Sequence, residues 1–290
     1  MYTIILFYKY ITIEDPEKER DEQRELCERH GLTGRLIVAN EGINGTLEGR
    51  EPDIKKYIQA LTEDERFSDI DFKTSKGTGG AFPKLSVKVR SEIVSSRLGS
   101  GVNPQEDTGT KIDPDELHRW YEEGRDFTVI DMRNDYEFVS GHFHNSVDPG
   151  MRNFRDLPEK AKELEHLKDK TVVTVCTGGV RCEKASAYLK SQGFSKVHQL
   201  KGGLHRYIEK YPAAHFKGGL YVFDGRVVME TAPDQEREVV GKCQFCGVNT
   251  EKYADDDSVT PSRQILCCDS CFQDQGNLRR NKESRKQTSA

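Results

Sequence analysis

A short apolar run that ends in cysteine, glycine and arginine constrains the fold of this chain more than any other feature. The stretch reads TVVTVCTGGVRCEKA and covers residues 171–185. Residues 171–175 are typical of a buried strand, and residues 184–191 are typical of a helix. Residues 176–181 are then the turn between them, at the carboxyl end of the strand. Open α/β sheets bind their ligands at that edge.

The composition of this turn favours an anion-binding loop. Gly178 and Gly179 allow successive backbone N–H groups to point inward at a helix N-terminus. Such a site lowers the pKa of a cysteine thiol, and Arg181 adds a positive charge. We therefore expect a thiolate at Cys176, with Cys182 as a second thiol nearby. The alternative is a buried structural cysteine, but packing alone does not require two glycines and an arginine.

The bulk composition predicts a water-soluble protein of two or three domains. The chain has 290 residues, 32% of them charged, and a formal net charge of −5, so any nucleic-acid contact must come from a local basic patch. No apolar run approaches the roughly 18–20 residues that cross a bilayer. The N-terminal stretch lacks the features of a signal peptide. We expect a cytoplasmic protein without membrane contact, whose cysteines are thiols, catalysts or metal ligands.

Three segments differ in composition, and the first, residues 1–98, predicts a ferredoxin-like α+β domain. Its apolar and charged runs alternate in the order βαββαβ. Residues 99–112 are rich in glycine, threonine and polar groups and predict a linker. The expected strands are 3–10, 34–39, 43–48, 69–74 and 85–90, and the expected helices are 15–30 and 51–62, with Cys27 in the core.

The second segment, residues 113–217, predicts a parallel α/β domain. Strand and helix patterns alternate along it, after a helix that Asp113 caps and Pro114 begins. The third segment, residues 218–290, has a hairpin near its start, a group of cysteines and a basic tail. We expect it to be a small zinc-binding module.

Two C-x-x-C pairs in the third segment predict a structural zinc site. Cys243 and Cys246 form one pair, Cys268 and Cys271 form the other, and 21 residues separate them. Each pair can bind one side of a tetrahedral ion, and four thiolates close the coordination shell. Disulfides are the alternative, which a cytosolic location disfavours. Cys267 could replace Cys268, although the spacing to Cys271 is then less usual.

The second segment resembles a rhodanese homology domain. The resemblance rests on VIDMRNDYEFVSGHFHNSV, residues 129–147, followed by CTGGVRCEKA. Rhodanese-like phosphatases have five residues between cysteine and arginine, whereas this loop has four, which favours sulfur or hydroxyl-type chemistry over phosphate ester cleavage. Asp131, at the end of its strand, is expected either to pair with Arg181 or a loop amide or, as strand-end aspartates also do, to cap a turn. The positions that match the first rhodanese motif are Asp131, Arg133, Glu137, Gly141 and His142.

The whole chain resembles the rhodanese-domain family of tRNA uridine(34) hydroxylases (TrhO). Three stretches occur in the family's order: ANEGINGTLEG at 39–49, FPKLSVKVRSEIV at 82–94, and CTGGVRCEKA. The resemblance implies oxygen-dependent 5-hydroxylation of uridine at wobble position 34 of tRNA, with molecular oxygen as co-substrate. It also implies that Cys176 is essential and that Cys182 assists. The sequence has no recognisable flavin, haem or NAD signature, and no two-histidine, one-carboxylate iron motif.

Two roles for Cys176 fit this chemistry. A thiolate can add to C6 of uracil, which makes C5 nucleophilic. Alternatively, an oxidised sulfur on Cys176 acts, and Cys182 is the resolving thiol. The sequence does not choose between them.

Contacts to tRNA are expected from two turns and from the tail. Glu41 and Asn44 lie in the turn sequence NEGING, where they either shape the turn or face the substrate. Lys76 and Lys84 flank a loop that contains Phe82, a mixture suited to phosphate contact and base stacking, or to a solvated loop. Residues 278–290 hold five basic side chains and one acidic one, which suits phosphate contact or a solubilising end.

Two other functions compete with the hydroxylase. One is a rhodanese-type sulfurtransferase that carries a persulfide on Cys176. The other is a non-catalytic RNA-binding protein, which the activated thiol disfavours. Five histidines have no metal-binding spacing and are expected to be ordinary surface or turn residues: His142, His144, His198, His205 and His215.

Overall fold

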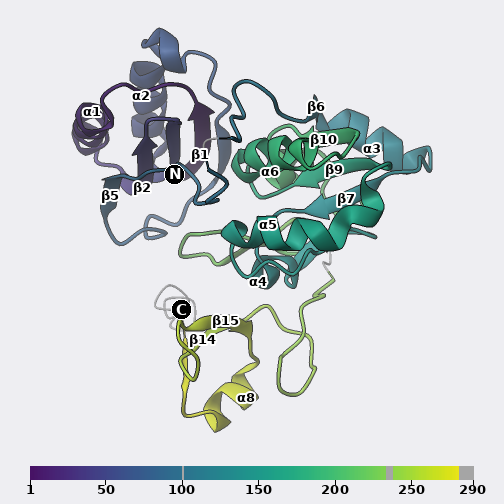
Figure 1. Ribbon diagram of the computed structural model, residues 1–290. Helices are drawn as coiled ribbons and strands as arrows, with labels where there is room; N and C mark the ends of the chain where they lie inside the picture. The colour runs from purple at the N-terminus through teal and green to yellow at the C-terminus, as the bar shows by residue number, and fades with distance from the viewer. Residues whose placement is uncertain (100, 233–237, 281–290) are drawn as a thin grey trace. The chain divides into compact units, whose positions relative to one another are not determined.

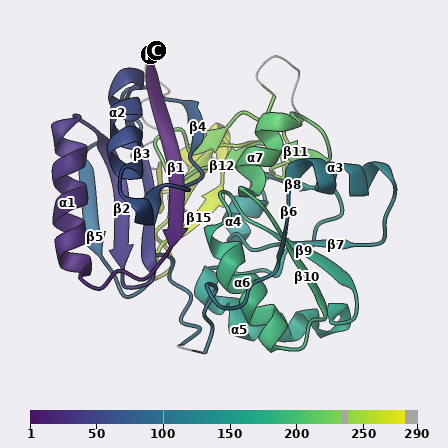
Figure 2. The same ribbon diagram turned by 90° about the horizontal axis from the view of Figure 1, so that it is seen from above.

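The computed structural model describes residues 1–99, 101–232 and 238–280. The chain folds as two compact units, Met1–Thr108 and Gly109–Ala290, which are considered separately below. Figure 1 shows the helices and strands with their labels, and Figure 2 shows them from above. The predicted boundaries at 98, 113 and 217 stay predictions.

The first unit contains a five-stranded sheet with strand order β4-β1-β3-β2-β5. The first four strands and the two helices follow the predicted βαββαβ order of a ferredoxin-like sandwich. The fifth strand extends the sheet by pairing parallel to β2. The elements are β1 (Tyr2–Tyr10), α1 (Pro16–Arg29), β2 (Thr33–Ala39), β3 (Gly42–Arg50), α2 (Glu51–Thr62), the 3₁₀ helix η1 (Glu65–Phe67), β4 (Lys73–Lys76) and β5 (Leu85–Val89).

Strand alternation builds the core of the first unit on the sheet face that α1 and α2 cover (Figure 1). Asp15 starts α1 by accepting a hydrogen bond from the Lys18 amide at 3.0 Å, as an N-cap does. Cys27 is buried in this core as predicted, and burial raises the pKa of its thiol to about 12. The core side chains include Ile5, Phe7, Leu36, Val38, Leu47, Val87, Ile54, Tyr57 and Leu61.

Two elements differ from the expectations. The strand expected at 69–74 begins later, at Lys73, because pairing with β1 sets its register from Lys73 opposite Leu6 to Lys76 opposite Thr3. The apolar residues before it, Ile70 and Phe72, pack on the core instead. The expected linker 99–112 ends in a strand, β6 (Thr110–Ile112), which pairs parallel to β10. A three-residue edge strand with a single buried side chain is too short for periodicity to show.

The second unit contains the predicted parallel sheet, with strand order β6-β10-β9-β7. All of its pairings are parallel, as strand–helix alternation requires. The strands are β6, β7 (Thr128–Asp131), β9 (Thr171–Val175) and β10 (Lys196–Leu200). The helices are α3 (Pro114–Glu122), α4 (Asp135–Phe138), η2 (Phe154–Asp156), α5 (Leu157–Lys160), η3 (Ala161–Leu167), α6 (Val180–Ser191) and α7 (Gly203–Lys210).

Short antiparallel pairs complete the second unit. β8 (Gly141–Phe143) pairs with β11 (Phe216–Gly218), and the predicted hairpin is formed by β12 (Leu220–Tyr221) and β13 (Val228–Met229). The cysteine-rich end has a three-stranded sheet and one helix. Its elements are β14 (Tyr253–Asp256), β15 (Arg263–Leu266), α8 (Asp269–Asp274) and β16 (Leu278–Arg280).

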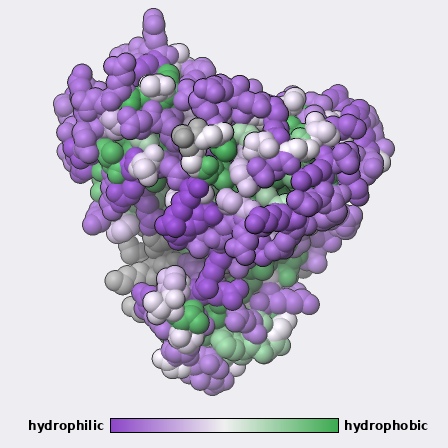
Figure 3. All heavy atoms as spheres, viewed as in Figure 1, coloured by the Kyte–Doolittle hydropathy of each residue, from purple (hydrophilic) through white to green (hydrophobic). Residues whose placement is uncertain are grey.

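The surface is rich in charged side chains, and the face drawn in Figure 3 is mostly hydrophilic. Among the residues that the structure describes, no helix combines the length and the apolar composition that crossing a bilayer requires.

Candidate active site and zinc site

The catalytic loop candidate, residues 176–181, lies where the sequence predicts it, between the end of β9 and the start of α6. Gly179 has φ of +102° and is the N-cap of α6, a conformation that a side chain would strain. Its amide N–H points back to Cys176 and donates to Sγ at 3.2 Å. Cys176 and Cys182 are both fully buried. The loop therefore presents backbone N–H groups to a sulfur at a helix N-terminus.

The surroundings of Cys176 favour a thiolate. Burial alone raises the pKa of the Cys176 thiol. The Cys182 thiol, the Arg181 charge and the N–H groups of residues 181 and 182 together outweigh burial and lower the pKa to about 6. The pKa of Cys182 moves the other way, well above its ordinary value, because of burial and the neighbouring Cys176 sulfur. Cys176 is therefore the anion of the pair, and Cys182 keeps its proton and donates to it.

Arg181 is held by Glu137, not by Asp131. Its two terminal nitrogens donate to the two carboxylate oxygens of Glu137 at 2.6 and 2.9 Å, and one of them also lies 3.3 Å from Thr177 Oγ1. The expected pairing with Asp131 is wrong, because Asp131 accepts from Arg133 at 2.7 Å in a separate, fully buried ion pair. The guanidinium thus acts on Cys176 through its charge, while its donors are committed to α4.

A second glycine pair, which sequence reasoning missed, supports the loop from α7. The amides of Leu204 and His205 donate to the carbonyls of Cys176 and Thr177 at 2.9 and 3.0 Å. A Cβ on Gly203 would lie 2.4 Å from the Cys176 carbonyl oxygen. The Gly-Gly sequence at 202–203 is the only signal for this contact in the sequence, and it does not say which loop is contacted.

The acidity of Cys176 has a testable pH dependence. The rate of alkylation of Cys176 by iodoacetamide, followed by peptide mass spectrometry, should rise with pH through a midpoint near 6 and level off above neutrality, since only the thiolate reacts. Cys182→Ala removes the donor that lowers the pKa most and should shift the midpoint upward. A midpoint near the ordinary thiol value in the wild-type protein would contradict the loop geometry described above.

The contact at Gly203 also has a measurable consequence. Gly203→Ala should lower the free energy of unfolding by about 3 kcal/mol or more, because φ of +65° is strained for alanine and the new Cβ meets backbone atoms of the loop. Gly193→Ala is the matched control, since Gly193 has φ of +91° but nothing within 4 Å of the added atom. It should cost only about 1–2 kcal/mol. Equal losses in urea unfolding of the two variants would show that Gly203 has no role in supporting the loop.

Glu41 and Asn44, the two polar residues of the first unit expected near substrate, both bind the backbone of Ile93. Glu41 Oε1 accepts from the Ile93 amide at 2.7 Å, and Asn44 Nδ2 donates to its carbonyl at 2.9 Å. The two side chains thereby hold one residue of the FPKLSVKVRSEIV stretch against β3. Their contact with substrate stays a prediction.

The loop that precedes β5 is organised by a buried glutamate that the sequence did not single out. The carboxylate of Glu48 is 2% exposed and accepts from the amides of Thr78, Gly79 and Ala81, each at 2.8 Å. Lys84 is exposed, as phosphate contact requires. Phe82 is buried beside Ala81, so the expected base stacking on this ring is wrong.

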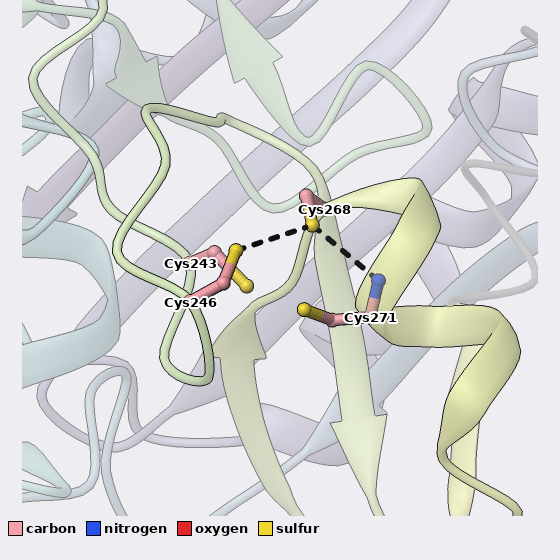
Figure 4. A group of neighbouring side chains, drawn as sticks. All are labelled: Cys243, Cys246, Cys268 and Cys271. Carbon is pink, nitrogen blue, oxygen red and sulfur yellow. Dashed lines mark hydrogen bonds between the residues drawn. The ribbon is translucent and has the colours of Figure 1, made fainter.

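The four predicted zinc ligands come together at the cysteine-rich end (Figure 4). Their sulfur atoms all lie within 4.8 Å of one another, and Cys246 Sγ is 3.7 Å from Cys268 Sγ. Zn–S bonds of about 2.3 Å give S–S edges of about 3.8 Å in a tetrahedron, so this edge fits zinc. The Cys271 amide donates to Cys268 Sγ at 3.5 Å, as knuckle amides do at thiolate sites.

Cys267 and the start of the tail have structural roles. Cys267 is buried, lies outside the four-cysteine group and donates to the carbonyl of Cys268. Arg279 and Arg280, which the basic tail includes, belong to β16 and pair with Asp257 and Asp269. Their charges are therefore already matched by carboxylates. The rest of the tail, residues 281–290, lies outside the described residues.

Three domain families match successive parts of the chain. Residues 2–93 match the UPF0176 acylphosphatase like domain, residues 113–210 match the rhodanese-like domain, and residues 217–281 match the rhodanase C-terminal domain. The first match agrees with the βαββαβ sandwich, and the second contains the Cys176 loop, α4 and α7.

Proteins from several bacteria are similar over nearly the full length. A protein named tRNA uridine(34) hydroxylase from Onion yellows phytoplasma (strain OY-M) is 44% identical over 92% of this chain and 87% of that protein. Proteins of the same name from Staphylococcus carnosus (strain TM300) and Cytophaga hutchinsonii are each 41% identical, over 95% and 93% of this chain and 91% and 86% of their own lengths. These identities confirm the resemblance on which the sequence analysis relied. The chain belongs to the tRNA uridine(34) hydroxylase family.

Proposed function

We propose that this protein catalyses 5-hydroxylation of uridine 34 in tRNA, with Cys176 as the catalytic residue. The observation that carries the proposal is a buried thiol with a pKa lowered to about 6, held by the Gly179 amide at the start of α6. A thiolate at that position is a nucleophile at neutral pH, which a structural cysteine is not. Membership of the hydroxylase family supplies the substrate, tRNA, and a cytoplasmic setting follows from it.

The proposed chemistry begins with addition of the thiolate to C6 of uracil. A C6–S bond forms, and the electron pair of the C5–C6 double bond moves to C5 as an enolate. C5 is then oxidised by dioxygen, while a two-electron donor supplies the electrons that reduce the second oxygen atom to water. Loss of the C5 proton expels the thiolate, restores the double bond and leaves 5-hydroxyuridine.

The second role of Cys176 stays open beside this one. In this role, dioxygen and a two-electron donor convert the Cys176 thiolate to a sulfenic acid, and the second oxygen atom leaves as water. C5 of uracil takes the hydroxyl group from sulfur, which breaks the S–O bond and returns the thiolate, and C5 then loses its proton. The Cys182 thiol resolves a sulfenic acid that has not reacted with uracil, by closing a disulfide with release of water. The proximity of Cys182 supports this role, since its side chain hydrogen-bonds to Cys176. In both roles Arg181 and Glu137 are positioning residues, and the amides of Gly179, Arg181 and Cys182 supply the inward N–H groups.

We propose that tRNA contacts residues of the first unit. Lys84 suits a phosphate, and Glu41 and Asn44 suit the anticodon nucleotides, either directly or by fixing residue 93. Neutralising Lys84 should weaken tRNA binding and reduce its salt dependence without altering the chemistry of Cys176.

We also propose that Cys243, Cys246, Cys268 and Cys271 hold a structural zinc ion, which fixes the fold of the C-terminal module and takes no part in the reaction. Elemental analysis should give about one tightly bound zinc per chain with these four thiolates. Cys246→Ser should lose this zinc and destabilise the module. Cys267→Ser is the control and should keep it, because Cys267 lies outside the group. Zinc content unaffected by Cys246→Ser would refute the assignment.

The alternative function is transfer of a persulfide from Cys176, which the rhodanese-like domain match over residues 113–210 favours. Deleting the gene and measuring tRNA nucleosides by mass spectrometry separates the two. Loss of wobble nucleosides derived from 5-hydroxyuridine, with 2-thiouridines intact, supports hydroxylation. Unchanged wobble nucleosides, together with strong thiosulfate:cyanide sulfurtransferase activity of the purified protein, would contradict hydroxylation and support sulfur transfer.

A further inference from the structure

Two histidines and a glutamate gather in the second unit at a place that the thiol chemistry does not use. His118 and Glu122 lie four residues apart on α3, so they share one helix face. His215 immediately precedes β11. One ligand atom from each of the three residues lies within 4.8 Å of those of the others, and His215 Nε2 is 2.8 Å from Glu122 Oε1.

Aromatic neighbours fix both imidazole rings. The His118 ring stacks on Tyr211 with centroids 3.9 Å apart and an interplanar angle of 7°. The His215 ring stacks on Tyr121 at 4.5 Å and 10°. His118 Nδ1 lies 3.2 Å from the Tyr207 hydroxyl, a contact that helps to orient the ring. Metal-binding histidines are oriented by such outer partners, which hold the ring and its tautomer.

The backbone at His215 is also held in an uncommon conformation. Its φ is +55°, a region that few non-glycine residues occupy. The His144 amide donates to the His215 carbonyl at 2.7 Å, and the pairing of β11 with β8 begins at the next residue. Surrounding structure thus enforces a strained backbone that aims this side chain at α3, and such strain concentrates at functional sites.

We propose that His118, Glu122 and His215 form a second metal site, which binds a divalent transition metal ion. Two imidazoles and one carboxylate select borderline metals such as Zn²⁺, Co²⁺ or Fe²⁺ over Mg²⁺ and Ca²⁺, which prefer oxygen ligands. Three protein ligands leave at least one coordination position open. The site is separate from the four cysteines and does not depend on which reaction Cys176 carries out.

The geometry needs only a small closure to hold such an ion. Metal–ligand bonds of about 2.0–2.1 Å place tetrahedral ligand atoms about 3.3 Å apart. The contact between His215 and Glu122 is already that short, and the upper limit of 4.8 Å leaves the His118 nitrogen within reach. Glu122 is exposed, so its carboxylate can move without disturbing the core. Spacing in the sequence shows no sign of this site, because Glu122 and His215 are 93 positions apart.

Titration of the full-length, zinc-loaded protein with Co²⁺ tests the proposal. One further equivalent of Co²⁺ should bind and give weak d–d absorption without thiolate-to-metal charge transfer, which separates it from exchange into the four-cysteine site. Glu122→Ala and His118→Gln should weaken this binding by about 100-fold or more, and Tyr207→Phe by about tenfold. His166→Gln is the control, because His166 is an exposed histidine outside the cluster, and it should bind Co²⁺ as the wild type does.

A thermal-shift measurement on the same proteins provides the second readout. Co²⁺ should raise the Tm of the wild type and of His166→Gln but not that of Glu122→Ala, since an ion that binds only the folded state stabilises it. The exposed position of Glu122 keeps this variant folded. Wild-type protein that binds no Co²⁺ beyond the cysteine site, or binding that persists equally in Glu122→Ala and His118→Gln, would overturn the proposal and leave an ordinary histidine–glutamate contact.

Discussion

Cys176→Ala is expected to reduce 5-hydroxylation of uridine 34 by more than about 10³-fold, the scale of loss when a covalent nucleophile is removed. The thiol carries both candidate roles, as the nucleophile that adds to C6 and as the sulfur that is oxidised. Alanine fills nearly the same buried volume, so the free energy of unfolding should fall by only about 1 kcal/mol. Nucleoside mass spectrometry of tRNA from deletion cells that express each variant measures the effect.

Cys27→Ala is the matched control for this experiment. Cys27 is also a fully buried free thiol, but burial raises its pKa to about 12, and no loop N–H groups or arginine charge oppose that rise. Its replacement should leave hydroxylation unchanged. Activity of Cys176→Ala above about a tenth of the wild type would exclude both thiol roles.

Cys182→Ala separates the two roles of Cys176. If Cys176 adds to C6, the variant should stay active with a pH optimum shifted upward, since it loses the donor that stabilises the thiolate. If Cys176 is oxidised and Cys182 resolves it, the first turnover should proceed but activity should fall over successive turnovers, because sulfenic acid that has not reacted with uracil oxidises further to sulfinic acid. Single-turnover and multiple-turnover assays on the same preparation distinguish these outcomes.

Glu137→Gln is expected to produce the largest loss of stability, about 3–5 kcal/mol. Glu137 is fully buried and accepts both terminal nitrogens of Arg181, whose side chain is only 8% exposed. Neutralising the carboxylate leaves a guanidinium buried without its counter-charge. The variant should also alkylate Cys176 more slowly at neutral pH, because Arg181 is no longer fixed. Urea unfolding measures the first effect and peptide mass spectrometry the second.

Glu209→Gln is the control for the ion pair. Glu209 accepts from Arg206 at 2.8 Å, which is the same pair of residue types at a similar distance in the same unit. Both side chains are about one third exposed or more, so solvent screens the interaction and the loss should stay below about 1 kcal/mol. Similar losses in the free energy of unfolding for both variants would show that the buried Glu137–Arg181 pair matters no more for stability than an exposed pair.

Features that depend on neighbouring residues could be predicted from the sequence. The loop from Cys176 to Arg181 is one, because strand, glycines and helix follow one another between Thr171 and Ser191. The two C-x-x-C knuckles are another, since each fixes its own half of the site. The order of strands and helices along the first unit followed from their alternating patterns, and pairing with β1 shifted only the bounds of β4.

Features that depend on distant pairing could not be predicted. Glu137 and Arg181 are 44 residues apart, and another carboxylate, Asp131 at the end of a strand, competes for the same assignment. Arg133 lies beside Asp131 in the core and donates to its carboxylate, so Asp131 is not the partner of Arg181. The basic residues Arg279 and Arg280 read as a free tail, yet antiparallel pairing of β16 with β14 places them beside carboxylates. Charge composition gives no information on such partners.

The most direct measurement uses purified protein, tRNA that lacks the modification and ¹⁸O₂. Extract from deletion cells serves as the electron source, and nucleoside mass spectrometry follows uridine 34. Wild-type protein should give 5-hydroxyuridine that carries one ¹⁸O atom, and Cys176→Ala should give none. Uridine 34 unchanged by the wild type, or hydroxylated equally by Cys176→Ala, would contradict a thiolate-dependent tRNA hydroxylase.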